Sequence, residues 1–389
     1  MMAKRKVYLD HGATTPLRKE VLDEMMPYLT NSFGNPSSIH SFGREARVAV
    51  EKARQQVADA IGASPNEIIF TSGGTEADNM AIQGVARALS SRGKHIITSA
   101  IEHHAVLDAC QSLEKEGFSL TYLPVDKYGL VQLKDLEKAI RPETILVTIM
   151  FANNEIGTVQ DVAGIGKICR SRGVYFNTDA VQAIGQLDVN VQEQNIDLLS
   201  MSAHKFYGPK GIGVLYKRQG VKLKPIIFGG GQERKFRPGT EYVAGIVGMG
   251  KAIELAVAEM ETKTAKMREL RDYFVAGLLE IGGVTLNGHP QQRLPNNVNV
   301  SIHNAEGEAL LLNLDMEGVA ASSGSACTSG SLEPSHVLRA IGLKHEVAHG
   351  SLRLTLGKDT EREDIDYTLK VLKPIVARLR KITGTLVRE

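Results

Sequence analysis

The chain has 389 residues, of which 42% are hydrophobic and 23% are charged, and its formal net charge is +2. This is the composition of a soluble globular protein large enough for two domains, and so small a net charge gives no reason to expect nucleic acid or an anionic membrane as a partner. No apolar run reaches the roughly 20 residues of a membrane span, and the first residues lack the apolar core of a signal peptide. The 3 cysteines include no Cys-x-x-Cys pair, which argues against a disulfide framework and a structural zinc site. We therefore expect a cytoplasmic protein that binds no metal.

Strand and helix patterns alternate from about residue 67 to residue 216. The first strand is expected at residues 67–70, followed by the glycine-rich turn Thr71-Ser-Gly-Gly74-Thr75-Glu76 and a helix over residues 77–89. The other expected strands are residues 95–98, 120–124, 145–150, 174–177 and 198–201, and the other expected helices are residues 105–113, 133–140 and 162–172. This alternation is typical of an α/β protein whose mostly parallel sheet is covered by helices on both faces.

A helical pattern over residues 242–281, charged between residues 259 and 271, follows the turn Gly229-Gly-Gly231. We interpret it as a long helix that leads to a second, smaller domain. Farther on, three leucines alternate with Arg353 in residues 351–356, which is typical of a strand. A lone arginine on such a strand needs an anionic partner, which is either a substrate carboxylate or an Asp or Glu of the chain.

Two positions that follow expected strands are suited to bind a phosphorylated cofactor. The turn at Gly74 and Thr75 opens a helix, and the free N–H groups and positive dipole of a helix start favour phosphate. Asp179 ends another strand, on the side of an α/β sheet where ligands bind. Its carboxylate can pair with the ring nitrogen of pyridoxal phosphate, or it can simply cap the structure that follows.

The segment Ser202-Ala-His204-Lys205 lies in a tight turn between two apolar runs. Ser202 and His204 can hydrogen-bond an anion, and Lys205 beside them is expected to be largely desolvated. A desolvated lysine is an amine nucleophile suited to Schiff-base chemistry, for which pyridoxal phosphate is the commonest cofactor. The alternative is a surface lysine in a glycine-rich turn.

The three cysteines lie in different surroundings. Cys327 belongs to a segment dominated by Gly and Ser, which predicts a mobile loop, and Leu332-Glu-Pro334 then opens a helix expected to end at Gly342. Cys110 and Cys169 lie in apolar, helical patterns and are expected to be buried and inert. From the loop alone, Cys327 can be either catalytic or structural.

With its other motifs, the chain resembles the cysteine desulfurases of the NifS/IscS group in the class V aminotransferase family. The matching segments keep the family's order over nearly the whole chain: Tyr8-Leu-Asp-His-Gly-Ala-Thr-Thr-Pro16, Phe33-Gly-Asn-Pro-Ser37, Thr71-Ser-Gly-Gly-Thr-Glu76, Glu102-His103, Asn153-Asn-Glu-Ile-Gly157, Asp179-Ala-Val-Gln182, Ser202-Ala-His-Lys205, Arg237-Pro-Gly-Thr240 and Ser323-Gly-Ser-Ala-Cys327-Thr-Ser-Gly. The pair His11-Gly12 departs from what the family usually carries before Ala-Thr-Thr.

The resemblance implies the aspartate aminotransferase fold of pyridoxal-phosphate enzymes. A large cofactor-binding domain is then expected at residues 16–262, and residues 1–15 and 263–389 are expected to form a small α/β domain that carries Cys327. The implied reaction converts L-cysteine to L-alanine and leaves a persulfide on Cys327. The implied partners are a second copy, in a homodimer, and an iron–sulfur scaffold or sulfur-carrier protein as the persulfide acceptor. The sequence ends at Glu389, before the extension that helps IscS-type members dock the scaffold, so the acceptor stays open.

The resemblance also assigns roles to individual residues. Lys205 carries the cofactor, and His103 stacks on its ring and transfers protons; a metal at Glu102-His103-His104 is not expected, because adjacent residues rarely converge on one ion. Asp179 pairs with the ring nitrogen and Gln182 with the phenolic oxygen. The phosphate ligands are Gly74, Thr75, Ser202 and His204, with Thr240 reaching in from the neighbouring subunit. The expected substrate ligands are Asn35, Asn154 and Arg353.

Two other functions are compatible with these residues. The same fold serves selenocysteine lyases and desulfurases for tRNA or DNA thiolation, and a comparison of turnover on cysteine and selenocysteine separates the lyase. An inactive relative that acts as a binding scaffold is the other alternative. The presence of Lys205, Asp179, His103, Cys327 and Arg353 argues against it, because an inactive copy is free to lose any of them.

Overall fold

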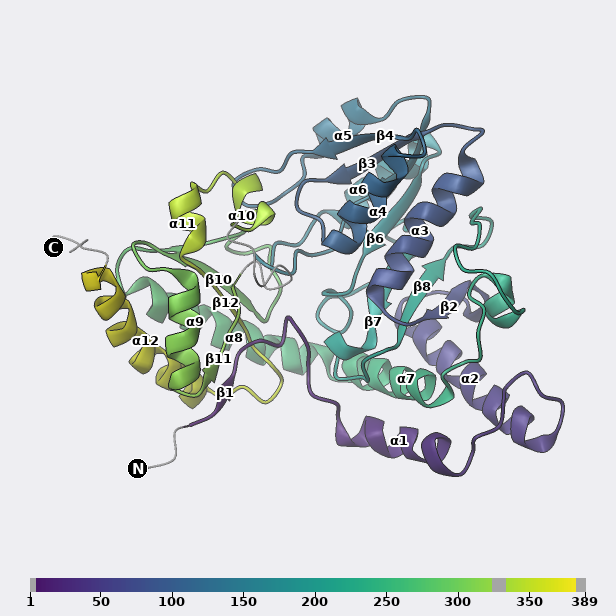
Figure 1. The fold of residues 1–389 in the computed structure, drawn as a ribbon, viewed down its shortest axis with the longest axis horizontal. Coiled ribbons are helices and arrows are strands. Elements are labelled where there is room, and N and C mark those ends of the chain that lie inside the picture. The colour runs from purple at the N-terminus through teal and green to yellow at the C-terminus, as the bar shows by residue number, and fades with distance from the viewer. Residues whose placement is uncertain (1–4, 324–333, 383–389) are drawn as a thin grey trace.

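The computed structural model describes residues 5–323 and 334–382, so Cys327 lies outside the described residues. The helices and strands form two parts, each with its own hydrophobic core (Figure 1). The larger part surrounds a seven-stranded sheet and the smaller part a three-stranded sheet.

The seven-stranded sheet is mostly parallel, as the sequence predicts. Its strands lie in the order β2 (Ile68–Thr71), β8 (Gly213–Lys217), β7 (Leu198–Ser202), β6 (Tyr175–Asp179), β5 (Thr144–Thr148), β3 (His95–Ser99) and β4 (Ser119–Leu123). Only β8 is antiparallel to its neighbours among these described strands. The six strands expected in this region are all present, each within two residues of its predicted ends.

Helices cover both faces of this sheet. One face packs against α3 (Gly74–Leu89) and α4 (His104–Glu114). The other packs against α2 (Ser41–Ala60), α5 (Leu133–Ala139), α6 (Val162–Arg172) and α7 (Val243–Ala258), with α1 (Lys19–Thr30) outside α7. Successive strand residues point to opposite faces of the sheet. Ile96 therefore packs on the face covered by α3 and α4, and Ile97 packs on the opposite face. Burial on both faces explains why these strands are continuous apolar runs in the sequence.

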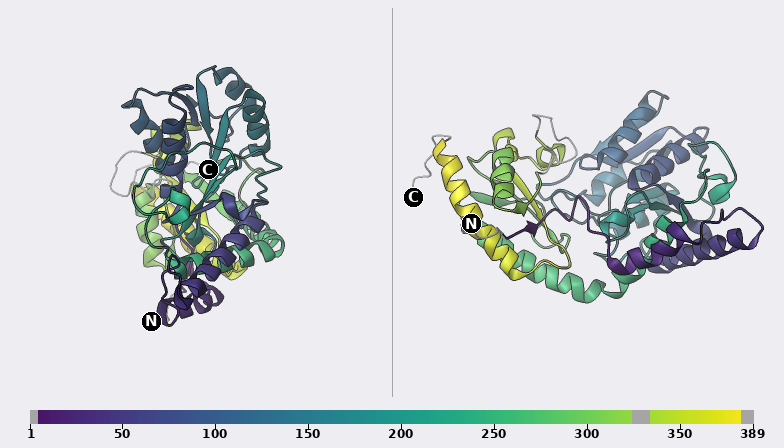
Figure 2. Two further views of the ribbon diagram at one scale, coloured as in Figure 1. Left: turned by 90° about the vertical axis from the view of Figure 1, so that its right-hand side faces the viewer. Right: turned by 60° about the horizontal axis from the view of Figure 1, so that its bottom comes forward.

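The helical pattern over residues 242–281 forms two helices instead of one. Glu259 (φ −96°, ψ −1°) separates α7 from α8 (Met260–Leu279). The carboxylate of Glu259 accepts hydrogen bonds of 2.7 and 2.9 Å from the guanidinium of Arg18. In succession the two helices run from the larger core to the smaller one (Figure 2).

The smaller part contains the antiparallel sheet β12 (Ser351–Thr355), β10 (Asn297–Ile302) and β9 (Val284–Leu286), covered by α9 (Gly307–Met316) and α12 (Arg362–Ile382). The N-terminus returns to it, because β1 (Val7–Tyr8) pairs in parallel with β11 (Val319–Ala320). Val7 and Leu9 are buried in this core. On this basis we propose the division into residues 16–262 and residues 1–15 with 263–389.

Two short helices, α10 (His336–Ala340) and α11 (His345–His349), connect the two parts. Val337 and Leu338 of α10 pack against Ile101 and Met150 of the larger part. Helix α10 begins later than the sequence predicts, because Ser335 caps it by accepting hydrogen bonds from two backbone N–H groups. No helix within residues 5–323 and 334–382 combines the length and apolar character needed to cross a bilayer.

A buried ion pair holds the loop that carries residues 237–240. Arg54 of α2 donates to both carboxylate oxygens of Glu233, at 2.7 and 2.9 Å, and the two side chains are 3% and 4% exposed. Glu233 lies in η3 (Gln232–Lys235), where three successive residues, Glu233, Arg234 and Lys235, have φ of 44°, 56° and 69°. Residues other than glycine rarely adopt this left-handed backbone conformation. The ion pair therefore stabilises a strained stretch of backbone.

We expect Arg54→Ala to lower the free energy of unfolding by about 3–5 kcal/mol, because it leaves the Glu233 carboxylate buried without a partner. Urea denaturation measures the effect. The matched control is Arg5→Ala, which removes the pair between Arg5, whose side chain is 45% exposed, and Asp364, and is expected to cost at most about 1 kcal/mol. Similar losses in the two variants would contradict the assignment.

Candidate active site

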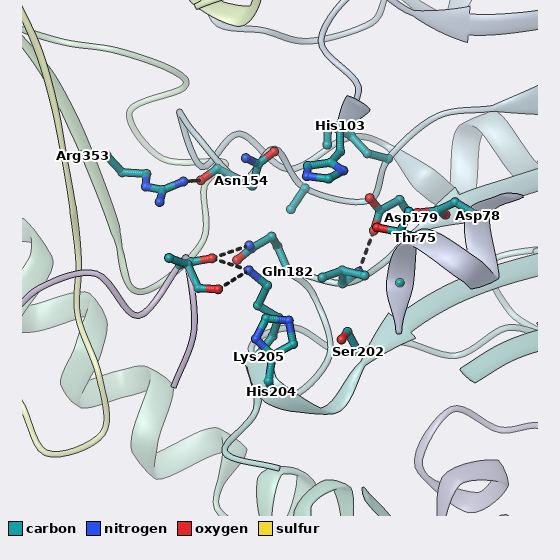
Figure 3. Close-up of a pocket in the computed structure, with 16 residues that line it drawn as sticks. Thr75, Asp78, His103, Asn154, Asp179, Gln182, Ser202, His204, Lys205 and Arg353 are labelled. Atoms are coloured by element: carbon teal, nitrogen blue, oxygen red, sulfur yellow. Dashed lines mark hydrogen bonds between the residues drawn. The ribbon is translucent and has the colours of Figure 1, made fainter. Parts of the chain in front are cut away.

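A pocket of about 310 Å³ lies between the two parts, at the carboxyl ends of β6 and β7 and the start of α3 (Figure 3). The sequence-predicted residues that line it are Gly74, Thr75, His103, Asn154, Asp179, Gln182, Ser202, His204, Lys205 and Arg353. They come from both parts of the molecule, since Arg353 belongs to β12 and the others to the larger part.

The start of α3 is shaped to hold an anion. Gly73 at the N-cap has no side chain to accept hydrogen bonds from the first turn, which leaves those N–H groups to a ligand. Neighbouring backbone lies very close, since a Cβ on Gly213 would lie 2.6 Å from the Cα of Gly73. The hydroxyls of Thr75 and Ser202 face the same space. These donors fit a phosphate group.

Lys205 ends η2 (Ala203–Lys205), the turn between β7 and β8. Its Nζ donates hydrogen bonds to the carbonyl oxygens of Gly12 at 2.6 Å and Ala13 at 2.8 Å. The expected turn is therefore present, and Lys205 is partly buried in it, with two backbone carbonyls as the hydrogen-bond acceptors of its amine. Beside it, burial and the charge of Lys205 lower the pKa of His204 to about 4, so this ring is neutral at neutral pH.

Residues 10–15, which we call the crossing segment, pass from the smaller part to the larger part along the pocket. Gln182 donates to the Gly12 carbonyl at 3.0 Å, and Thr14 Oγ1 lies 3.1 Å from His204 Nδ1. The N–H of Gly12 in turn donates to Thr355 Oγ1 on β12 at 2.7 Å. Several side chains of the pocket are thus held by one stretch of backbone.

Asp179 and His103 lie on the opposite wall. Asp179 is buried at the end of β6, and its Oδ1 accepts a hydrogen bond of 2.9 Å from the Val181 N–H. His103 is the N-cap of α4, and its Nδ1 accepts from the Ala105 N–H at 3.1 Å. In the neutral ring the proton is therefore on Nε2. The carboxyl group of Asp179 suits a ring nitrogen, as expected of a pyridoxal-phosphate site.

Arg353 has partners within the chain, which the sequence left open. Its NH2 forms an ion pair with Asp10 Oδ1 at 3.0 Å, and its NH1 donates to the Asn154 carbonyl at 3.1 Å. The Arg353 side chain is 4% exposed, and its Nε is buried without a partner among the described residues. Of the two kinds of anionic partner that the sequence allows, the structure shows the carboxylate of the chain itself, Asp10. The unsatisfied Nε nevertheless leaves donor capacity for a ligand carboxylate.

Two of the expected residues do not line the pocket of this chain. Asn35 and Thr240 are exposed and do not line it. Cys327 lies outside the described residues. Sequence reasoning in turn missed Asp10 and Asp78, which contribute carboxyl groups at the site. Asp10 lies within the family motif at residues 8–16 but was given no role, whereas Asp78 lies inside a helical pattern that gives no signal of its position.

Comparisons with known proteins identify the family of the chain. Residues 7–368 match the Aminotransferase class-V family. The protein named Cysteine desulfurase IscS from Dictyoglomus turgidum is 60% identical over 98% of this chain and 97% of its own length. Among solved structures, a NifS-like protein has a TM-score of 0.91 at 40% identity, covering 96% of this chain and 100% of its own. SspA in complex with cysteine has a TM-score of 0.81 at 39% identity, covering 90% of this chain and 99% of its own.

The chain belongs to the class-V aminotransferase family and, within it, to the cysteine desulfurases of the NifS/IscS group. The family and fold predicted from the sequence are confirmed.

The other two cysteines are unsuited to carry sulfur. Cys110 in α4 and Cys169 in α6 are buried, as predicted, and burial raises the pKa of the Cys169 thiol to about 12 and that of Cys110 further. We expect iodoacetamide at neutral pH to leave both unmodified in the native protein and to modify both in urea, because alkylation needs an accessible thiolate. Peptide mass spectrometry measures the labelling. Rapid modification of either cysteine in the native protein would contradict the structure.

Proposed function

We propose that this protein is a pyridoxal-phosphate-dependent cysteine desulfurase that converts L-cysteine to L-alanine and leaves the sulfur as a persulfide on Cys327. The observation that carries the proposal is one pocket lined by the amine of Lys205, the carboxyl group of Asp179 and the phosphate-binding start of α3. The desulfurase relative and the neighbour solved with cysteine support this substrate.

The residues at one end of the pocket bind the cofactor, and those at the other end bind the substrate. Bound pyridoxal phosphate supplies an electron sink for bonds at the α-carbon of an amino acid. Lys205 Nζ holds the cofactor, Gln182 its phenolic oxygen, and Thr75, Ser202 and the neutral His204 its phosphate. At the other end, Arg353 binds the substrate carboxylate, with Asn154 beside it.

Proton and sulfur transfer require two further groups. With Nδ1 occupied by the Ala105 N–H, His103 presents Nε2 to the pocket as a proton donor. The Cβ–Sγ bond of cysteine breaks as the thiolate of Cys327 takes Sγ, and Cβ takes up a proton to give alanine. The sulfur leaves as a persulfide, so no external oxidant is needed.

A homodimer explains why Asn35 and Thr240, which the family motifs assign to the site, do not line the pocket of a single chain. Phe33 and Ile39, on either side of Asn35, are 75% and 91% exposed, and Phe228 in the loop before Thr240 is 85% exposed. Exposed apolar side chains on these two loops favour association with another protein surface. A second copy that covers these loops brings Thr240 toward the partner's phosphate site and Asn35 toward a substrate.

The acceptor of the persulfide is an iron–sulfur scaffold or a sulfur-carrier protein, in accord with relatives named IscS. Unpaired Cys110 and Cys169 are in accord with a reducing compartment, so we place the protein in the cytoplasm.

Two variants test the reaction as a pair. Lys205→Ala is expected to remove the visible band of the lysine-bound cofactor and to lower alanine production by at least about 100-fold, because no other amine takes the place of Nζ. Cys327→Ala should keep the visible band and lose persulfide and sulfide production. Absorption spectra and mass spectrometry after addition of cysteine measure both.

The proposal fails if Lys205→Ala still turns over cysteine. It also fails if the extra sulfur of the wild-type protein is found on Cys110 or Cys169.

Arg353→Ala is expected to lower kcat/KM for cysteine by about 10- to 150-fold, the equivalent of about 1.5–3 kcal/mol for a charged, bidentate hydrogen bond. It should also lower the melting temperature, because Asp10 loses its partner. Arg353→Lys should recover only part of the activity, since an ammonium cannot reproduce the guanidinium fork.

Asp10→Asn is the matched control, because it breaks the same ion pair and keeps the guanidinium. It should lose stability with a much smaller loss of kcat/KM. Equal kinetic losses in Arg353→Ala and Asp10→Asn would mean that Arg353 acts only through the ion pair.

A further inference from the structure

Asp78 is a buried carboxyl group in the wall of the pocket to which the proposed reaction gives no role. It lies on α3, one turn after Gly74, is 1% exposed and lines the pocket next to Asp179 (Figure 3). Its Oδ1 has no hydrogen-bond partner among the described residues. Ser200 Oγ, on the residue paired with Asp179 in the register of β6 and β7, has no hydrogen bond of good geometry either, but this hydroxyl lies close enough to Asp78 to lower the pKa of its carboxyl group in part. Two carboxyl groups are thus buried beside each other in a wall that offers few partners.

Two neighbouring carboxyl groups in such a place cannot both be ionised at an acceptable cost, so one of them keeps a proton. The surroundings distinguish the two. The charge that acts most strongly on Asp78 is the carboxylate of Asp179, whereas Asp179 faces the His103 ring and the Lys205 ammonium, both of which lower its pKa. Negative neighbours favour the neutral acid and positive neighbours favour the carboxylate.

Burial strengthens this asymmetry. It raises the pKa of both aspartates, and the charge of Asp179 raises that of Asp78 further. The other titratable groups near Asp78 do not oppose the effect. Burial raises the pKa of Glu102 to about 8, and it keeps the Cys110 thiol of α4 neutral.

We propose that Asp78 is a positioning residue that stays a neutral carboxylic acid, so that Asp179 alone presents a negative charge to the ring nitrogen of the cofactor. This inference rests on the proposed function and goes beyond it. One carboxylate balances one protonated ring nitrogen, whereas two would leave an unpaired charge in the buried wall. Asp78 thus acts through Asp179: because Asp78 stays neutral, the two aspartates together carry a single negative charge at this end of the pocket.

The first test uses the stability of the full-length protein without added cofactor. An aspartate ionises near pH 3.9 when unfolded, so a buried acid that keeps its proton destabilises the fold increasingly as the pH rises above about 4. Asp78→Asn copies the neutral acid and cannot ionise. We expect its melting temperature to equal or exceed that of the wild type at pH 8, with an advantage that grows between pH 5 and pH 8.

Asp197→Asn is the matched control. Asp197 is equally buried, but it is paired with Arg218 at 2.6 Å and accepts from the Phe176 N–H at 2.9 Å. Its replacement should lower the melting temperature, because an ionised partner is lost. A comparable loss in Asp78→Asn, without the growing advantage at high pH, would overturn the proposal. Should Asp78→Asn not fold, Asp78→Ser, a smaller neutral donor, is judged by the same pH trend.

The second test uses the protein loaded with pyridoxal phosphate. In Asp78→Asn the midpoint of the pH titration of the visible band should match the wild type, and the dissociation constant of the cofactor should change less than about threefold, because no charge is removed. Asp179→Asn should weaken cofactor binding by about 10- to 150-fold, the value of a charged hydrogen bond. A titration midpoint in Asp78→Asn that moves as far as in Asp179→Asn would show that Asp78 is ionised.

Different results would overturn the proposed function and the role of Asp78. A wild-type protein that shows no visible band with pyridoxal phosphate would overturn the proposed function and, with it, the role of Asp78 toward the cofactor. A wild-type protein that binds the cofactor normally, with an Asp78→Asn variant of shifted titration midpoint, would overturn only the inference about Asp78.

Discussion

The pocket depends on the contacts of the crossing segment, residues 10–15, with both parts of the molecule. The segment accepts hydrogen bonds from Lys205 and Gln182 through backbone carbonyls, and it carries the carboxylate that pairs with Arg353. A backbone carbonyl needs no particular side chain, yet it is fixed in space by the strands on either side of it. The distance between the lysine end and the arginine end of the pocket is therefore set by how the N-terminus returns to the smaller part, at β1 and β11.

Buried charge is managed in different ways in this protein. Arg54 and Glu233 neutralise each other in a bidentate ion pair. Arg353 is neutralised by Asp10 where the larger and smaller parts of the molecule meet. Asp78 and Asp179 have the same sign and cannot form such a pair, so a proton takes the place of the missing cation in our proposal. Each solution avoids the cost of an isolated charge in a medium of low dielectric constant, and each one restrains a loop or a wall of the pocket.

The positions of Asn35 and Thr240 connect the pocket to assembly. Both residues match the family's motifs, yet both are exposed in a single chain and accompanied by exposed aromatic or aliphatic side chains. The buried Arg54–Glu233 pair holds the loop that leads to Thr240 in a left-handed conformation that would not persist by itself. Because this loop is already fixed, Thr240 can contact a second copy of the chain without a further loss of conformational entropy.

The sequence by itself determined the alternating strands and helices of the larger part, the lysine turn after β7 and the carboxylate at the end of β6. These features are local, and their hydrophobic periodicity and turn residues can be read within a short window. Only the tertiary structure decided that residues 242–281 break at Glu259, that Asp10 faces Arg353, and that Asp78 lies beside Asp179. Arg353 is 343 residues from Asp10, and such partners are chosen by how the strands and helices pack, which no local pattern records.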